Sequence, residues 1–277
     1  MSSTMSQVLL AVSVATAGGL NFSCSTDTAP KAGTPAYFWA AAKETFAAGD
    51  YGKTSEHLDK VLATDNEYTA RARPWRLILT SGMARGYMDL ADNLEYGVKA
   101  KKADPGGFRK YISNSRSTAG RLGLQFAEAF MLFQKGKDDP IVLGFNFPSG
   151  SAAAVPEFAR ASVGTPLLPT ELESAQKHAI ERAILLQTCE AAGAADDTAK
   201  ALELFKNGNA QVPRAAFMTA MANALYEQAQ LFGQRKLGDP EKLKVFSNLA
   251  SSALKDVPET KQTKELNAKI QSGMKKK

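Results

Sequence analysis

Histidine and cysteine, the side chains that most often bind metals or act in catalysis, are nearly missing from this sequence. It contains two histidines, His57 and His178, and two cysteines, Cys24 and Cys189. The closest approach to a ligand pair is His178 with Glu181, and a metal site needs at least one more such pair. Neither a glycine-rich phosphate loop nor a Gly-x-Ser-x-Gly elbow is present. We therefore expect no catalytic residue, no metal, no cofactor and no disulfide framework.

A hydrophobic run long enough to span a bilayer is also missing. The apolar run 8–20 is too short for a membrane-spanning helix and has the length of a signal-peptide core. The residues before it contain no lysine or arginine, although a signal peptide usually carries one. We interpret residues 1–23 as a signal peptide and expect export, with a simple N-terminal tail as the alternative.

Two cleavage positions compete near the end of this segment. Ala15-Thr16-Ala17 fits the small-x-small rule for a released protein. Leu20-Asn21-Phe22-Ser23-Cys24 resembles a bacterial lipobox, with its leucine one position too early. That resemblance implies a periplasmic protein anchored in a membrane by lipidated Cys24, with the polar residues 24–35 as a flexible tether. We prefer the lipoprotein interpretation.

The composition is that of a folded helical protein. Hydrophobic residues make up 44% of the chain and charged residues 22%, which suffices for a core and argues against disorder. Alanine-rich windows favour helices, so we predict an all-α fold. The formal charge of +6 suits an anionic partner or simple solubility. No arginine-rich strip with interleaved aromatics is present, so we expect no nucleic-acid binding.

Residues 38–66 carry the most specific pattern. Phe38, Ala42 and Phe46 lie four residues apart and form one helical stripe. Gly49-Asp50-Tyr51 then breaks the helix, because glycine permits the turn and aspartate is a favoured N-cap. Leu58 belongs to the apolar stripe of a second helix.

These residues resemble a tetratricopeptide repeat (TPR), which has an early aromatic, a small residue one turn later and Gly-Asp-Tyr-like chemistry at the turn. The departures are Ala41 for the usual leucine, Thr54 for a small alanine and Asn66 for the closing proline. The resemblance implies that residues 36–277 form one domain of TPR-like helical hairpins, packed as a short solenoid or bundle. A helical hairpin from an unrelated bundle is the alternative.

Further helical patterns follow this hairpin. Gly82 and Gly86 share one helical face and predict a close approach of two helices. Pro74 is expected to precede the first of these helices, and Thr170 is expected to cap the third. The patterns cover residues 77–102, 108–134, 170–191, 196–207, 214–232 and 241–256, the last two resembling a second, degenerate repeat.

Residues 138–169 are the least helical part of the chain, with five prolines and an apolar run at 141–147. We predict a long structured insertion that contains a short strand pair or a small helix. Phe145, Phe147 and Phe158 are candidates to line or cap a binding groove. Alternatively, the insertion crosses the bundle and buries these rings.

Two functions fit these observations. The first is a non-catalytic scaffold of the cell envelope that binds a protein or peptide in a helical groove, with the aromatic insertion as a latch. The second is a periplasmic component that binds a small apolar ligand for a solute transporter, implied by a looser resemblance to tetratricopeptide lipoproteins. An apolar cavity under Phe145 and Phe158 would favour the second function, and an open polar groove the first.

Overall fold

The computed structural model describes residues 30–195, 197–206, 208–255 and 257–275. Helices form nearly all of the regular structure in these residues, so the predicted all-α fold is confirmed. In chain order they are α1 (Pro35–Ala47), α2 (Tyr51–Val61), α3 (Thr69–Lys101), the 3-10 turn η1 (Pro105–Gly107), α4 (Phe108–Phe133), α5 (Pro156–Ser162), α6 (Pro169–Ala191), α7 (Thr198–Leu204), α8 (Arg214–Leu231), α9 (Pro240–Ala253) and α10 (Lys261–Lys275).

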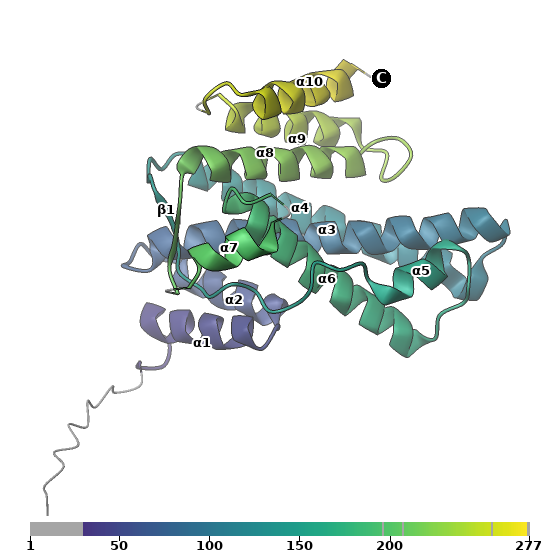
Figure 1. The fold of residues 1–277 in the computed structure, drawn as a ribbon, viewed down its shortest axis with the longest axis horizontal. Coiled ribbons are helices and arrows are strands. Elements are labelled where there is room, and N and C mark those ends of the chain that lie inside the picture. Colours follow the sequence, from purple (N-terminus) through teal and green to yellow (C-terminus); the bar gives the residue numbers. More distant parts are fainter. Residues whose placement is uncertain (1–29, 196, 207, 256, 276–277) are drawn as a thin grey trace, which may run out of the picture.

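Helix α3 runs through the middle of the molecule, with α4 beside it and α6 packed across it (Figure 1). The α1–α2 hairpin lies on one side of this centre, and α8, α9 and α10 are stacked in that order on the other. One cluster of buried side chains joins the two sides. Its members come from helices on both sides and at the centre, and they include Trp39, Leu77, Phe126, Phe217, Phe246 and Ile270.

The hairpin predicted over residues 38–66 is present as α1 and α2. Ala42, Phe46 and Leu58 are buried on its inner face, and Phe38 packs at the edge of the core. Gly49 has a positive φ of 73°, which glycine adopts without strain. The Asp50 carboxylate accepts a hydrogen bond from the backbone N–H of Lys53 and caps α2.

Helix α3 begins earlier than predicted and passes through Pro74, so the expected break there is wrong. Proline removes one backbone hydrogen bond, and Pro74, as the sixth residue of α3, lies just past the four N-terminal N–H groups that have no partner within a helix. The next residues compensate by burial, since Trp75, Leu77 and Ile78 are all 0% exposed. Tertiary packing therefore outweighs the local signal.

The close approach predicted from Gly82 and Gly86 occurs between α3 and α6. A Cβ atom at Gly86 would lie 2.7 Å from the Cα of Ile180, and one at Gly82 would lie 2.8 Å from Cγ1 of Ile184. Glycine is required at both positions because the helices touch through their backbones. This contact fixes α6 against the centre of the molecule.

The start of α6 differs from the prediction. The N-cap is Leu168, not Thr170, and the Glu171 side chain accepts a hydrogen bond from the Leu168 N–H at 2.8 Å. Pro169 occupies the first helical position, for which its fixed φ is suited. Helix α10 was not predicted, because little more than Leu266 and Ile270 faces the core while the rest of its surface is polar.

The insertion 138–169 contains one short strand and helix α5. Strand β1 (Ile141–Leu143) pairs antiparallel with β2 (Ala210–Val212), so its partner lies outside the insertion. Ile141 is opposite Val212, and Leu143 is opposite Ala210. This ladder ties the insertion to the segment between α7 and α8.

Candidate functional site

The three phenylalanines singled out from the insertion lie in different places. Phe145 is 1% exposed and belongs to the core. Phe147 is half-buried against Phe205, with ring centroids 5.5 Å apart. Phe158, from α5, packs on a separate cluster formed with α3, α4 and α6. The three rings therefore do not form one exposed surface. Phe145 fits the alternative interpretation, in which the insertion crosses the bundle and buries its aromatic rings.

Phe145 occupies the inner face of the α1–α2 hairpin. Its ring centroid lies 4.9 Å from those of Trp39 and Phe46 and 5.0 Å from that of Trp75. A Cβ atom at Gly144 would lie 3.1 Å from the Trp39 ring, so the backbone of the insertion also packs tightly here. The chain's own insertion thus fills the groove that this hairpin would offer to a partner.

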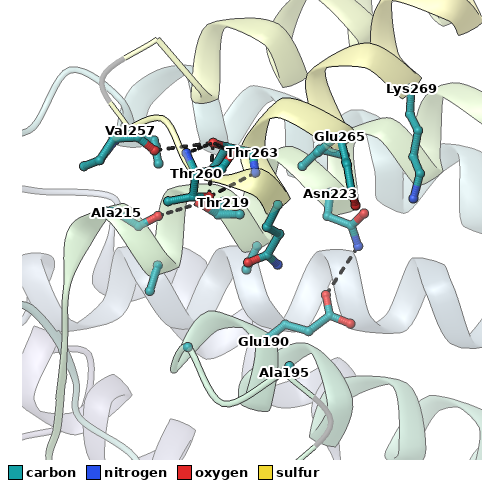
Figure 2. A pocket seen from close by; sticks show the side chains of 16 residues that line it. Glu190, Ala195, Ala215, Thr219, Asn223, Val257, Thr260, Thr263, Glu265 and Lys269 are labelled. Carbon is teal, nitrogen blue, oxygen red and sulfur yellow. Dashed lines mark hydrogen bonds between the residues drawn. The ribbon is translucent and has the colours of Figure 1, made fainter.

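A hollow remains on the opposite side of the molecule, and we call it the α8–α10 groove (Figure 2). Its volume is about 580 Å³. Three regions line it: the last turn of α6 with the loop after it, the first half of α8, and α10 with the loop before it. The lining residues are Glu190, Gly193, Ala195, Ala215, Ala216, Thr219, Ala220, Asn223, Val257, Pro258, Thr260, Gln262, Thr263, Glu265, Leu266 and Lys269.

Small side chains on α8 and in the loop after α6 leave this space open. Helix α6 ends at Ala191, and Gly193 turns the chain with a φ of 72°. A Cβ atom at Gly193 would approach the Ala216 side chain to 3.1 Å, so the loop lies directly against α8. On the other wall, Thr260 and Thr263 exchange hydrogen bonds between backbone N–H groups and hydroxyls, which fixes the start of α10.

A network of charged side chains lies under the groove. Arg85 of α3 donates a hydrogen bond from Nη1 to Oε1 of Glu190 at 2.8 Å. Its Nε lies 3.7 Å from Oε2 of Glu227. The Asn223 amide lies between the two glutamates, 3.5 Å from Oε2 of Glu190 and 3.3 Å from Oε1 of Glu227. Only Glu190 and Asn223 of this network line the groove.

Negative charge is in excess in this network. The pKa of Glu227 is raised to about 7, chiefly by burial, with a further contribution from the nearby Glu190 and Asp89 that opposes the lowering effect of Arg85. Burial also raises the pKa of Asp89. Burial alone would lower the pKa of Arg85, yet Glu227, Glu190 and Asp89 hold it above its usual value.

The sequence patterns did not indicate this site. Arg85 and Glu190 are 105 positions apart, and nothing in the sequence points to their contact. The sequence offers one indirect indication, which is that both charged residues have small or apolar neighbours. Arg85 lies between Gly82 and Gly86, and Glu190 follows the buried Cys189. A charged side chain on a buried face needs a charged partner elsewhere in the fold.

The histidines do not form a metal site with the residues named from the sequence. His178 lies with Nδ1 3.1 Å from Oε1 of Glu157, and 46% of its side chain is exposed. His57 stacks on Phe38 with ring centroids 6.3 Å apart. Within the part of the chain that the structure describes, no group of three or more His, Cys, Asp and Glu residues is placed to hold a metal.

The signal peptide predicted over residues 1–23 and the lipidation site Cys24 lie outside the described residues. Among the helices that are described, none combines the length and apolar character needed to cross a membrane. No protein-family model matches this chain, and comparisons with curated proteins and with solved structures find no similar protein.

Proposed function

We propose that this protein is a non-catalytic scaffold of the cell envelope that binds a protein or peptide partner in the α8–α10 groove. The observation that carries this proposal is the groove itself, a hollow of about 580 Å³ between helices that are otherwise closely packed. Pockets of several hundred cubic ångströms accommodate a few side chains of a partner or one small molecule.

The lining favours a peptide over an apolar ligand. Threonine, asparagine, glutamine and charged side chains line the groove together with alanine and glycine, and the larger apolar residues are Val257, Pro258 and Leu266. Small residues allow a peptide backbone to approach, and the polar groups provide hydrogen bonds for it. The alternative, a pocket for a small apolar ligand under Phe145, has less support because Trp39, Phe46 and Trp75 already surround that ring.

The envelope location rests on the sequence before α1. The apolar run 8–20 and the lipobox-like residues ending at Cys24 support export and anchoring by a lipid. We expect Cys24→Ser to release the protein from the membrane fraction to the soluble fraction of the expressing cell. Membrane association that is unchanged in Cys24→Ser would contradict the lipid anchor and leave the groove unaffected.

Partner binding is tested by blocking the groove. Thr219 is half-buried on the α8 wall, so Thr219→Trp would fill part of the hollow with an indole ring. Asn248→Trp places the same ring on an exposed position of α9 outside the groove and serves as the control. Wild type and both variants are used to purify partners from solubilised membranes, and the partners are identified by mass spectrometry.

The expected result is a protein that co-purifies with wild type and Asn248→Trp and is lost from Thr219→Trp. Circular dichroism of both variants checks that the helical fold is retained. A partner that binds all three proteins equally would place the binding surface elsewhere. A bound small molecule that is displaced by Thr219→Trp would favour the ligand-binding alternative.

A further inference from the structure

We propose that the α8–α10 groove selects its peptide by a basic side chain, lysine or arginine, that forms an ion pair with Glu190. This inference rests on the proposed peptide-binding function and adds the chemical class of the residue that is recognised. It is carried by the position of the Glu190 carboxylate and by the distribution of charge around the groove.

The Glu190 carboxylate is held in place and retains capacity for another donor. One oxygen, Oε1, accepts the short hydrogen bond from Arg85. The other, Oε2, has only the long 3.5 Å contact with the Asn223 amide among the hydrogen bonds of the described residues. Because a carboxylate oxygen accepts two hydrogen bonds, Oε2 can receive an ammonium or guanidinium group from the groove.

The charge of the groove is opposite to that of the chain. The whole chain has a formal charge of +6, whereas the charged residues lining the groove are Glu190, Glu265 and Lys269, which sum to −1. Glu265 and Lys269 are four residues apart on α10, a spacing at which opposite charges compensate each other. Glu190 on the facing wall is left as the charge that a ligand would meet (Figure 2).

The network behind Glu190 strengthens this preference. Arg85 is shared between Glu190 and Glu227, and Asp89 lies close enough to add to the negative potential. Besides Arg85, the cations that act on Asp89 are Arg182, at 3.9 Å, and Lys236. A ligand cation would supply the missing positive charge. Since 24% of the Glu190 side chain is exposed, this pair would be less screened than one on the open surface.

The test is selection of peptides from a phage-displayed random dodecapeptide library on immobilised full-length protein. The wild type is compared with Glu190→Gln, with the groove-blocked Thr219→Trp, and with Glu128→Gln as a matched control. The glutamine in Glu190→Gln keeps a carbonyl oxygen for the Arg85 hydrogen bond, and Glu128 is an exposed residue of α4 outside the groove. Affinities of the enriched peptides are then measured by fluorescence anisotropy.

We expect enriched peptides to share a lysine or arginine, to bind Glu190→Gln at least about tenfold more weakly, and to bind Glu128→Gln unchanged. Replacing that basic residue by norleucine or glutamine in the peptide tests the same pair without altering the protein, and the same loss is expected. Peptides without a shared basic residue that are lost from Thr219→Trp would overturn this inference and retain the groove as a binding site. If no peptide is enriched on the wild type, both this inference and the proposed peptide-binding function would be overturned.

Discussion

The α1–α2 hairpin and the α8–α9 hairpin are built by the same local rules but have different surroundings. In both, an aspartate caps the second helix: Asp50 accepts from the N–H of Lys53 at 3.1 Å, and Asp239 from the N–H of Lys242 at 3.0 Å. The first hairpin has its inner face filled by Phe145, whereas the α8–α10 groove remains open beside the second. An insertion between helices has thus converted one potential binding face into core.

The largest expected loss of stability comes from removing the Phe145 ring from the inner face of the α1–α2 hairpin. Phe145→Ala removes a ring that is 1% exposed and contacts three other aromatic rings. We expect the free energy of unfolding, measured by guanidinium denaturation, to fall by about 3–5 kcal/mol. Phe147→Ala, at a half-buried ring of the same insertion, is the comparison and should cost clearly less. Equal losses in the two variants would mean that the packing of Phe145 against Trp39, Phe46 and Trp75 contributes no more to stability than the packing of Phe147.

A smaller loss of stability is expected at the contact between α3 and α6, which lies between the two hairpins. Gly86→Ala places a methyl group 2.7 Å from the Cα of Ile180, so α3 and α6 must separate. We expect a loss of about 1–3 kcal/mol in the free energy of unfolding. Gly52→Ala is the matched control, because its Cβ would find its nearest contact at 3.8 Å, and alanine should stabilise α2 by about 0.5–1 kcal/mol. A loss at Gly52 as large as that at Gly86 would rule out helix contact as the cause.

The charge network beside the groove predicts a pH dependence. The pKa of Glu227 is raised from 4.5 to about 7, so its protonated form contributes stability that is complete below pH 4.5 and lost as pH rises through 7. Glu227→Gln stays neutral throughout. Its unfolding free energy relative to wild type should therefore increase between these pH values, by on the order of 2–3 kcal/mol.

This dependence is measured by urea denaturation across that pH range. Glu44→Gln, at an exposed glutamate of α1, controls for the substitution itself in the other hairpin. A difference between Glu227→Gln and wild type that stays constant with pH would mean that folding leaves the pKa of Glu227 unchanged. The excess of negative charge beside the groove would then be smaller than the geometry suggests.

The smallest effect tests what the two hairpins have in common. Asp50→Ala removes the cap of α2 and should lower the free energy of unfolding by about 1 kcal/mol. Asp239→Ala removes the corresponding cap of α9, and we expect a loss of the same sign. Thermal unfolding followed by circular dichroism measures both. A loss at only one position would show that the two turns are stabilised differently.

The sequence predicts the parts of this fold that depend on neighbouring residues. The turn at Gly49, the stripe from Phe38 to Phe46 and the contact face of Gly82 and Gly86 all follow from spacings of a few residues. The continuity of α3 through Pro74 was not predicted, because burial of the following residues outweighs the proline.

The candidate site depends on contacts between distant parts of the chain. The β1–β2 ladder joins segments about 70 residues apart, and Arg85 reaches Glu190 across the α3–α6 contact. No local pattern encodes either contact. For this reason the sequence points to the aromatic residues of the insertion as a candidate surface and not to the groove beside α8.

Phe145 lies far along the sequence from the three aromatic residues that surround it, and this affects the order in which they emerge during translation. About 70 residues of sequence separate Trp75 from Phe145. At a synthesis rate of about 5–20 residues per second, Trp39, Phe46 and Trp75 are therefore made several seconds before the Phe145 ring that packs between them. Until then Trp39, Phe46 and Trp75 lack their central neighbour. A fragment that stops before residue 141 would lack Phe145, so the three rings would lose the contacts with its ring.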